Sequence, residues 1–382
     1  MSTITYQVKV RDTSGNPVAF FAGAGRGEHG GGLQSLSYNK RLCTSGGWEV
    51  RIHGDDERVE LLRLQEVLPK RVDYIFEFLR RDPGYLDWYT DFAGFHRSDE
   101  FTEDQEGHQI YIARGVGFND QLAGEAIRYY AGSEEASKSG AAETVAKEFV
   151  DENIGPNAGV DDNGDSRVRA GLTVEVNAGT GLTWTGARAN KNLLDVLVEI
   201  AKFATADFNV VQTGDATFEF QWRDGQWGDD KTRGNVPAVI FGSQYNNATN
   251  IRLSYSRSDE VNVVYVGGQG VGAARNYVTQ STTAINDSPW SRRAVFRDAK
   301  NTPTVAGLED TGDEILEKQK SVVAISFDIK QTTATRYGVH WDYGDLVTVE
   351  FRGQDFDKKI VGVTVTLSSD GKETIKPEVE NA

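Results

Sequence analysis

A glycine-rich segment over residues 262–280, NVVYVGGQGVGAARNYVTQ, has the spacing of a nucleotide-binding loop. Gly268, Gly270 and Ala273 fit the pattern G-x-G-x-x-A, in which backbone amides at a helix N-terminus hold the pyrophosphate of a dinucleotide. That chemistry needs a helix directly after Ala273 and an acidic residue about 20 positions further on. The sequence after Ala273 is instead rich in β-forming residues, and the acid, Asp287, lies in the turn sequence NDSP. We therefore interpret the glycines as the turn of a β-hairpin with positive φ angles, and keep nucleotide binding as a distant alternative.

Two other segments imitate ligand-binding loops incompletely. The glycines between Gly23 and Gly32 lack the Gly-Lys-Ser/Thr ending of a phosphate-binding loop, which favours a mobile loop. Three oxygen-bearing side chains begin a segment like a calcium loop: Asp161, Asn163 and Asp165. Ser166 then stands where the turn glycine belongs, and Leu172 where the bidentate glutamate belongs. We predict no calcium site there.

Residue types that serve most catalytic and metal sites are sparse. The histidines show neither i, i+4 pairing nor an H-E-x-x-H pattern, and we expect them at surface or turn positions: His29, His53, His96, His108 and His340. Cys43 is the single cysteine, which excludes disulfides within the chain and cysteine-based zinc clusters and indicates folding in a reducing cytoplasm. A glycosidase pair of carboxylates stays open as an alternative, because only a spatial separation identifies it. The sequence predicts no enzyme and no catalytic, cofactor-binding or metal-binding residue.

The chain of 382 residues carries a formal net charge of −16, from 41 Lys and Arg against 57 Asp and Glu. No run of Lys and Arg exceeds two residues, so the chain has no basic patch for gripping phosphates. A solvated acidic surface is the simplest explanation of the charge. The N-terminus, MSTITYQVKV, has no signal-peptide pattern, and no apolar stretch reaches about 18 residues. We expect neither an exported precursor nor an integral membrane protein.

Strand patterns dominate both ends of the chain. Tyr6, Val8 and Val10 alternate with polar residues, and a turn signal leads into a return strand at 18–21, which predicts a hairpin. Further strands are expected at 33–38, 48–53, 74–78, 86–92, 109–113, 208–211, 217–223, 238–241, 251–255, 261–266, 276–279, 322–329, 346–351 and 359–367. Helical periodicity predicts helices at 119–130, 142–150, 190–204 and 308–319. Strands and helices are segregated, which favours a β-rich α+β protein of several domains over a doubly wound sheet.

Several segments, taken in order, resemble the tail hub proteins of long-tailed phages, which are related to the central baseplate hub of contractile tails. The resemblance covers most of the chain and lies in IYIARGVGFNDQLAGEAIRYYAG (110–132), ATNIRLSYSRSDEVNVVYVGGQGVGAARNY (248–277), SPWSRRAVFRDAK (288–300), YGVHWDYGDLVTVEF (337–351) and SSDGKETIKPE (368–378). It places the glycine motif in a hairpin of a barrel domain and Gly344-Asp345 before a late strand.

The resemblance implies a fold with two antiparallel β-barrel domains like those of the tail tube, and a helical insertion. The expected divisions are an N-terminal barrel-like domain at 1–116, a helical α+β domain at 117–206, a second barrel-like domain at 207–306 and a C-terminal segment at 307–382 that completes the hub. A trimer of such chains would offer six barrels to the hexameric tube, since three chains match a six-fold ring with equivalent contacts only through two similar modules each.

The resemblance also implies a structural role in the virion tail, after assembly in the host cytoplasm. The expected partners are two further copies of the chain, the tail tube or distal tail protein, the tape-measure protein, and tail-tip, fibre or receptor-binding proteins, with phage DNA only in transit. A tail-associated glycan-binding or glycan-degrading module is the alternative.

Overall fold

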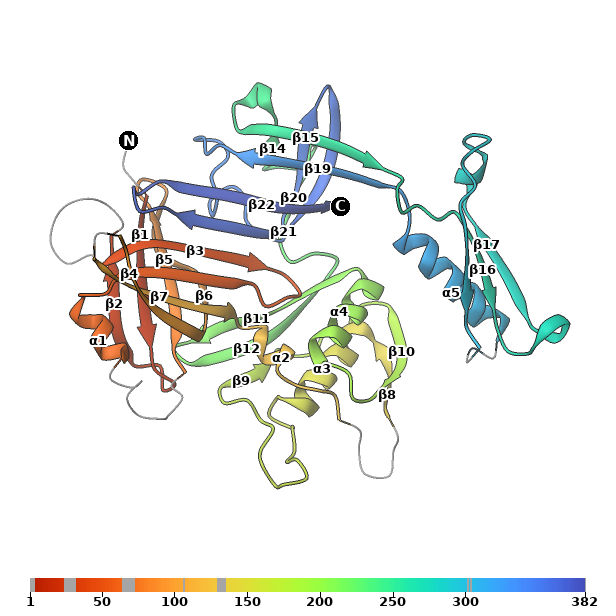
Figure 1. The fold of residues 1–382 in the computed structure, drawn as a ribbon, viewed down its shortest axis with the longest axis horizontal. Coiled ribbons are helices and arrows are strands. Elements are labelled where there is room, and N and C mark those ends of the chain that lie inside the picture. Colours follow the sequence, from red (N-terminus) through yellow and green to blue (C-terminus); the bar gives the residue numbers. More distant parts are fainter. Residues whose placement is uncertain are drawn as a thin grey trace. The chain divides into compact units, whose positions relative to one another are not determined.

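The computed structural model describes residues 4–23, 32–63, 73–105, 107–128, 135–300, 302 and 304–381. The chain divides into a larger unit, residues 1–250 with 327–382, and a smaller unit, residues 251–326 (Figure 1). Most of the glycine-rich loop expected between Gly23 and Gly32, and His29 within it, lies outside the described residues.

A twelve-stranded sheet organises the larger unit, in the order β13-β20-β21-β3-β4-β7-β6-β5-β1-β2, with β14 on β20 and β22 on β21. Its strands are β1 (Thr5–Arg11), β2 (Pro17–Ala22), β3 (Leu33–Arg41), β4 (Gly47–His53), β5 (Ile75–Asp82), β6 (Leu86–Glu103), β7 (Gln109–Gly117), β13 (Asp230–Lys231), β14 (Ile240–Phe241), β20 (Leu346–Phe351), β21 (Gln354–Leu367) and β22 (Glu373–Asn381). A short helix, α1 (Glu57–Arg63), follows β4. β21 pairs with β3, so the C-terminal strands complete the sheet that the N-terminal strands begin (Figure 1).

Alternation of apolar and polar residues explains why the N-terminal segments form strands. Tyr6, Val8 and Val10 are buried on one face of β1, and the predicted hairpin with β2 is confirmed. Trp48 on β4 stacks on Phe76 on β5 with ring centroids 4.5 Å apart, which fixes an aromatic core inside the curved sheet.

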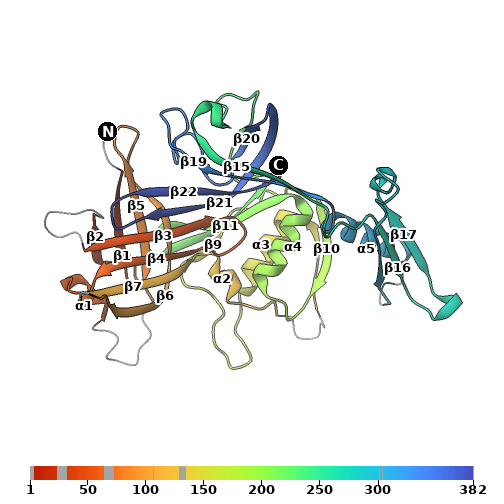
Figure 2. The same ribbon diagram turned by 45° about the horizontal axis from the view of Figure 1, so that its top comes forward.

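Three helices, of which α2 is a single turn, and two small sheets make up the described middle of the larger unit. The elements are α2 (Asp120–Ala123), β8 (Ala136–Ala141), α3 (Ala142–Asn153), β9 (Leu172–Val174), β10 (Thr183–Arg188), α4 (Leu193–Ala204), β11 (Ala206–Gly214) and β12 (Thr217–Asp224). α3 and α4 share one hydrophobic core with β11 and β12, in which Phe149, Leu197 and Phe208 are fully buried (Figure 2). This region confirms the predicted helices at 142–150 and 190–204.

The helix expected at 119–130 is wrong beyond its first turn. α2 ends at Ala123, and the chain after Gly124 is extended, because Ile127 exchanges backbone hydrogen bonds with Lys191 and Asn190. Ile127 is still fully buried. Its tertiary pairing outweighs the helical periodicity of the segment.

The smaller unit contains a three-stranded sheet and one helix. The strand order is β17 (Tyr277–Ser281), β16 (Val263–Gly267) and β18 (Ala294–Asp298), and α5 (Val305–Lys318) packs on this sheet through Leu308 and Leu316 (Figure 2). The chain enters the unit along β15 (Ala248–Ser256) and leaves it along β19 (Val322–Ile329), and these two strands pair with each other.

The protein is therefore β-rich and contains several sheets. None of the sheets that the described ranges form is closed into a barrel, and the two-barrel fold and the four expected domain divisions stay predictions. No helix within those ranges is long and apolar enough to cross a membrane.

Candidate functional site

The glycine motif forms the turn of a β-hairpin, as predicted. β16 pairs antiparallel with β17, with Gly267 opposite Tyr277, and the backbone after Ala273 continues as an extended strand instead of a long helix. Gly270 has a φ of +104°, whereas Gly268 does not need a positive φ. The Arg275 guanidinium closes the turn by donating hydrogen bonds to the carbonyl oxygens of Gly267 and Gly268, at 2.8 and 3.0 Å. A cation therefore lies where the dinucleotide motif would need amides around an anion.

The calcium-like segment uses its first carboxylate to hold its own backbone. Asp161 Oδ1 accepts hydrogen bonds from the backbone amides of Asn163 and Asp165, at 2.8 and 3.0 Å. Those bonds hold the pKa of Asp161 below its usual range, as in an Asx-turn.

The described histidines and the cysteine lie apart from one another. No three His, Cys, Asp or Glu side chains gather into a metal-binding group in the part of the chain that the structure describes. His96, expected at a surface or turn, lies on β6 with its ring 5.7 Å from that of Phe76, and burial lowers its pKa. Burial also raises the pKa of the Cys43 thiol to about 12, so this sulfur is a poor nucleophile.

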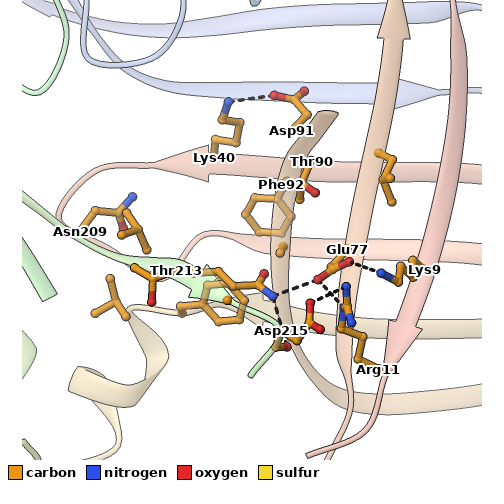
Figure 3. Close-up of a pocket in the computed structure, with 18 of the residues that line it drawn as sticks. Lys9, Arg11, Lys40, Glu77, Thr90, Asp91, Phe92, Asn209, Thr213 and Asp215 are labelled. Atoms are coloured by element: carbon orange, nitrogen blue, oxygen red, sulfur yellow. Dashed lines mark hydrogen bonds and ion pairs between the residues drawn. The ribbon is translucent and has the colours of Figure 1, made fainter. Parts of the chain in front are cut away.

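A pocket of about 510 Å³ in the larger unit collects the charged side chains that sequence patterns did not identify (Figure 3). Residues of β1, β3, β5, β6, β7 and β11 line it, so strands of the large sheet meet the β11–β12 hairpin there. Figure 3 shows its charges in two groups, one around Glu77 and one around Asp91.

The Glu77 group joins the large sheet to the β11–β12 hairpin. Glu77 Oε1 accepts hydrogen bonds from Arg11 Nε at 2.7 Å and from Gln212 Nε2 at 2.9 Å. Arg11 also pairs with Asp215 at 2.8 Å, and Lys9 Nζ lies 3.7 Å from Glu77. The side chains of Arg11 and Glu77 are both nearly buried, so each would be costly to leave unpaired.

The Asp91 group joins β3 and β6 to the segment before β20. The fully buried Asp91 carboxylate accepts hydrogen bonds from Lys40 at 2.9 Å, from the Tyr337 hydroxyl at 2.8 Å, and from the Tyr38 hydroxyl. Lys40 also pairs with Asp342 at 3.0 Å. Burial alone would lower the pKa of Lys40, but the carboxylates of Asp342 and Asp91 raise it well above its ordinary value. The two carboxylates therefore favour the charged form of the ammonium group.

A third ion network lies nearby on β5. The Arg80 side chain is fully buried and pairs with Glu373 of β22 at 2.8 Å, while its guanidinium stacks 5.3 Å from the Tyr337 ring. Asp82 pairs with Arg336 at 3.1 Å. These contacts tie the C-terminal strands to the N-terminal sheet.

These networks hold distant segments of the chain together. Each charged residue that lines the pocket is in an ion pair: Lys9, Arg11, Lys40, Arg41, Glu77, Asp91 and Asp215. The weak signal in the sequence was the presence of charged residues in predicted strands, and it did not show which charges would pair.

Comparison with known proteins identifies relatives along nearly the whole chain. The family described as Siphovirus ReqiPepy6 Gp37-like protein matches residues 26–379. No curated protein sequence matches the chain. The structure is similar to that of the 43 kDa tail protein of prophage MuSo2 from Shewanella oneidensis. The match covers 98% of each chain, with a TM-score of 0.60 and 11% sequence identity. The tail protein from Neisseria meningitidis MC58 covers 98% of this chain and 96% of its own, with a TM-score of 0.56 and 15% identity. The chain shares their fold.

Proposed function

The chain belongs to the siphovirus ReqiPepy6 Gp37-like family, and from that membership we propose that it is the tail hub, a ring of three copies that joins the hexameric tail tube to the tail tip. It is a structural component of the virion tail. The observation that carries the proposal is the family match over residues 26–379, together with a fold shared over 98% of the chain with two tail proteins, one of them from a prophage.

The trimer follows from symmetry. Three copies meet a six-fold ring through equivalent contacts if each copy offers two similar modules. We propose that the two modules are the two ends of the twelve-stranded sheet, β1 to β7 at one end and β20 to β22 with β13 and β14 at the other. The Arg80–Glu373 ion pair crosses between these ends, and the hydrogen bond from the Tyr337 hydroxyl to Asp91 links β6 to the segment before β20; both would keep the two ends in register under load.

The ring would surround an axial channel whose inner face is net negative. Duplex DNA carries about one negative charge per 1.7 Å of its axis, so a basic wall would bind it and slow its passage. The net charge of −16 without a Lys or Arg run supports an acidic wall that lets DNA slide once the tip opens. At physiological salt the Debye length is about 8 Å, so only acids close to the channel surface would act. The tape-measure protein or a plug would fill the space beforehand.

An electron cryo-microscopy map of the intact tail tests the proposal. We expect three copies of the chain between the tube and the tip, with an axial opening lined mainly by Asp and Glu. Two or six copies would contradict the trimer. A closed axis, or a wall lined mainly by Lys and Arg, would rule out the proposed channel. We propose no catalytic step, because the charges that line the described pocket are engaged with one another.

A further inference from the structure

The sheet of the smaller unit has one covered face and one open face. On the covered face, Val264 and Val266 are fully buried against α5. On the open face, Tyr265, Tyr277 and Phe296 are 38%, 59% and 54% exposed. Strand register places them together, since Tyr265 lies opposite Phe296 and Gly267 lies opposite Tyr277.

Two arginines complete this surface, which we call the aromatic face: Tyr265, Arg275, Tyr277, Arg292 and Phe296. The Arg275 guanidinium stacks 5.7 Å from the Tyr277 ring and 5.4 Å from the Phe296 ring. Arg292 Nη2 donates a hydrogen bond to the Tyr265 hydroxyl at 2.7 Å. Large exposed aromatic rings and arginines are the residues that protein interfaces concentrate at their centres.

The aromatic face is held in place before any partner binds. Arg275 is fixed by the Gly267 and Gly268 carbonyls and by Asp298. Gly267 leaves room for this guanidinium, because a Cβ at position 267 would lie 2.7 Å from Arg275 Cζ and would displace it. Fixed side chains lose little conformational entropy on binding, which favours a strong contact.

The charge of the chain is divided unevenly between its two units. Residues 251–326 hold nine Lys and Arg and nine Asp and Glu, so the whole net charge of −16 belongs to the larger unit. Within the smaller unit, five acids lie on the helix that covers the other face: Glu309, Asp310, Asp313, Glu314 and Glu317. On the aromatic face, Arg275 is paired with Asp298, so Arg292, which is bound to the neutral Tyr265 hydroxyl, supplies the positive charge that complements an acidic body.

We propose that the aromatic face docks onto the larger unit of a second copy of this chain. The acidic larger unit supplies the complementary charge, and every ring subunit has such a neighbour at a fixed position. A contact in which one surface meets a different surface of the next copy closes into a ring when the rotation between copies is a whole fraction of a turn, as it is in the proposed trimer. The inference rests on the proposed function only in requiring more than one copy per tail.

Photo-crosslinking in the assembled tail tests the contact. The photoreactive amino acid p-benzoylphenylalanine replaces Tyr277 in one preparation and Phe296 in another, and purified tails are irradiated. We expect a product of twice the chain's mass, with crosslinked peptides from residues 1–250 or 327–382 of the second copy. The matched control carries the same probe at Asp313, which is exposed on α5, and should give at least tenfold less of this product.

A charge reversal checks the electrostatic part of the argument. Arg292→Glu added to the Phe296 probe should lower the crosslink yield at least tenfold, whereas Arg292→Lys should retain most of it. Crosslinks to another tail protein, to host glycan, or within one chain alone would overturn the inference. If neither probe variant assembles into tails, a map of the unmodified tail tests the contact instead. The inference requires the aromatic face to lie against a neighbouring copy in that map, and a face exposed to solvent would overturn it.

Copy number separates this inference from the proposed function. Three copies per tail without the crosslink would overturn the docking surface and leave the ring. A crosslinked pair in a tail with another copy number would overturn the trimer and leave the surface.

Discussion

The Asp91 carboxylate accepts hydrogen bonds from Tyr38 and Lys40 on β3 and from Tyr337, which lies in the C-terminal part of the chain. Asp91→Asn would leave the buried Lys40 ammonium with Asp342 as its remaining anion. We expect the free energy of unfolding to fall by about 3 kcal/mol, because a buried charge that loses a partner is strongly destabilising. Urea denaturation measures the change.

The matched control for that substitution is Asp87→Asn, since the Asp87 side chain is 85% exposed and pairs with Arg81 at the surface. Its effect should stay within about 0.5 kcal/mol. Equal effects at the two positions would mean that the buried network contributes nothing to stability.

The lowered pKa of the Glu143 carboxyl predicts that the free energy of unfolding depends on pH. Burial alone would raise its pKa, but hydrogen bonds from the Ala178 amide, the Lys147 ammonium and the Thr180 amide and hydroxyl lower it to about 2. The unfolded carboxyl titrates near its ordinary value, so the stabilisation is present above about pH 4.5 and is lost as pH falls toward 2. Glu143→Gln should therefore cost about 2 kcal/mol at pH 7 and progressively less below pH 4.5.

Urea denaturation of the unchanged protein and of the Glu143→Gln variant, between pH 3 and pH 7, checks this prediction. Glu148→Gln is the control, because Glu148 lies on the same helix with a side chain that is 48% exposed. A difference between Glu143→Gln and the unchanged protein that stays constant with pH would contradict the cause given for the pKa.

The Cys43 thiol should react slowly with Ellman's reagent. With a pKa of about 12, only about one thiol in ten thousand is ionised at pH 8, and the thiolate is the reactive form. Absorbance should rise at least a hundredfold more slowly for the folded protein than for the protein in guanidinium. Fast labelling of the folded protein would show that the sulfur is accessible and ionised.

At the scale of elements, two glycine turns allow the cost of a left-handed backbone to be distinguished from the cost of a steric clash. Gly344 before β20 and Gly84 between β5 and β6 have nearly the same φ, +91° and +90°. A Cβ at 344 would lie 2.8 Å from both the Gly228 amide nitrogen and the Trp227 Cβ, whereas a Cβ at 84 meets no atom within 4 Å. Both substitutions to Ala bear the cost of a left-handed backbone, about 1 kcal/mol, and Gly344→Ala should lose about 2 kcal/mol more through the clash. Thermal unfolding of the two variants compares them directly.

The elements that the sequence predicted well are those whose own residues carry the pattern. The strands at 322–329 and 346–351 begin and end as expected, and helix α5 follows its apolar periodicity. β8 and β10 were missed because their polar sequences become strands only through pairing with each other. β15 likewise pairs with β19, a strand that follows it only after residues 257–321. Such partners are chosen by tertiary contacts that no local pattern records.

The candidate site was hidden for the same reason. Its members Lys40, Asp91 and Asp342 are far apart in the sequence, and each alone has the appearance of a surface charge. Their meeting depends on β21 closing against β3, a pairing between the two ends of the chain. The glycine hairpin, in contrast, could be predicted because the residues after Ala273 favour a strand.

At the scale of the whole molecule, the two units should open independently. The smaller unit has its own core around Val266, which is fully buried against α5, and that core contains residues of the smaller unit alone. Val266→Ala removes about 2 kcal/mol of packing, which corresponds to about a 30-fold faster amide exchange by local opening. Hydrogen exchange should quicken across 261–320 and stay unchanged in β1 to β7. Val8→Ala removes packing at a fully buried position on β1. It should quicken amide exchange in β1 to β7 and leave exchange across 261–320 unchanged. Faster exchange in both units from either substitution would mean that the chain unfolds as one cooperative body.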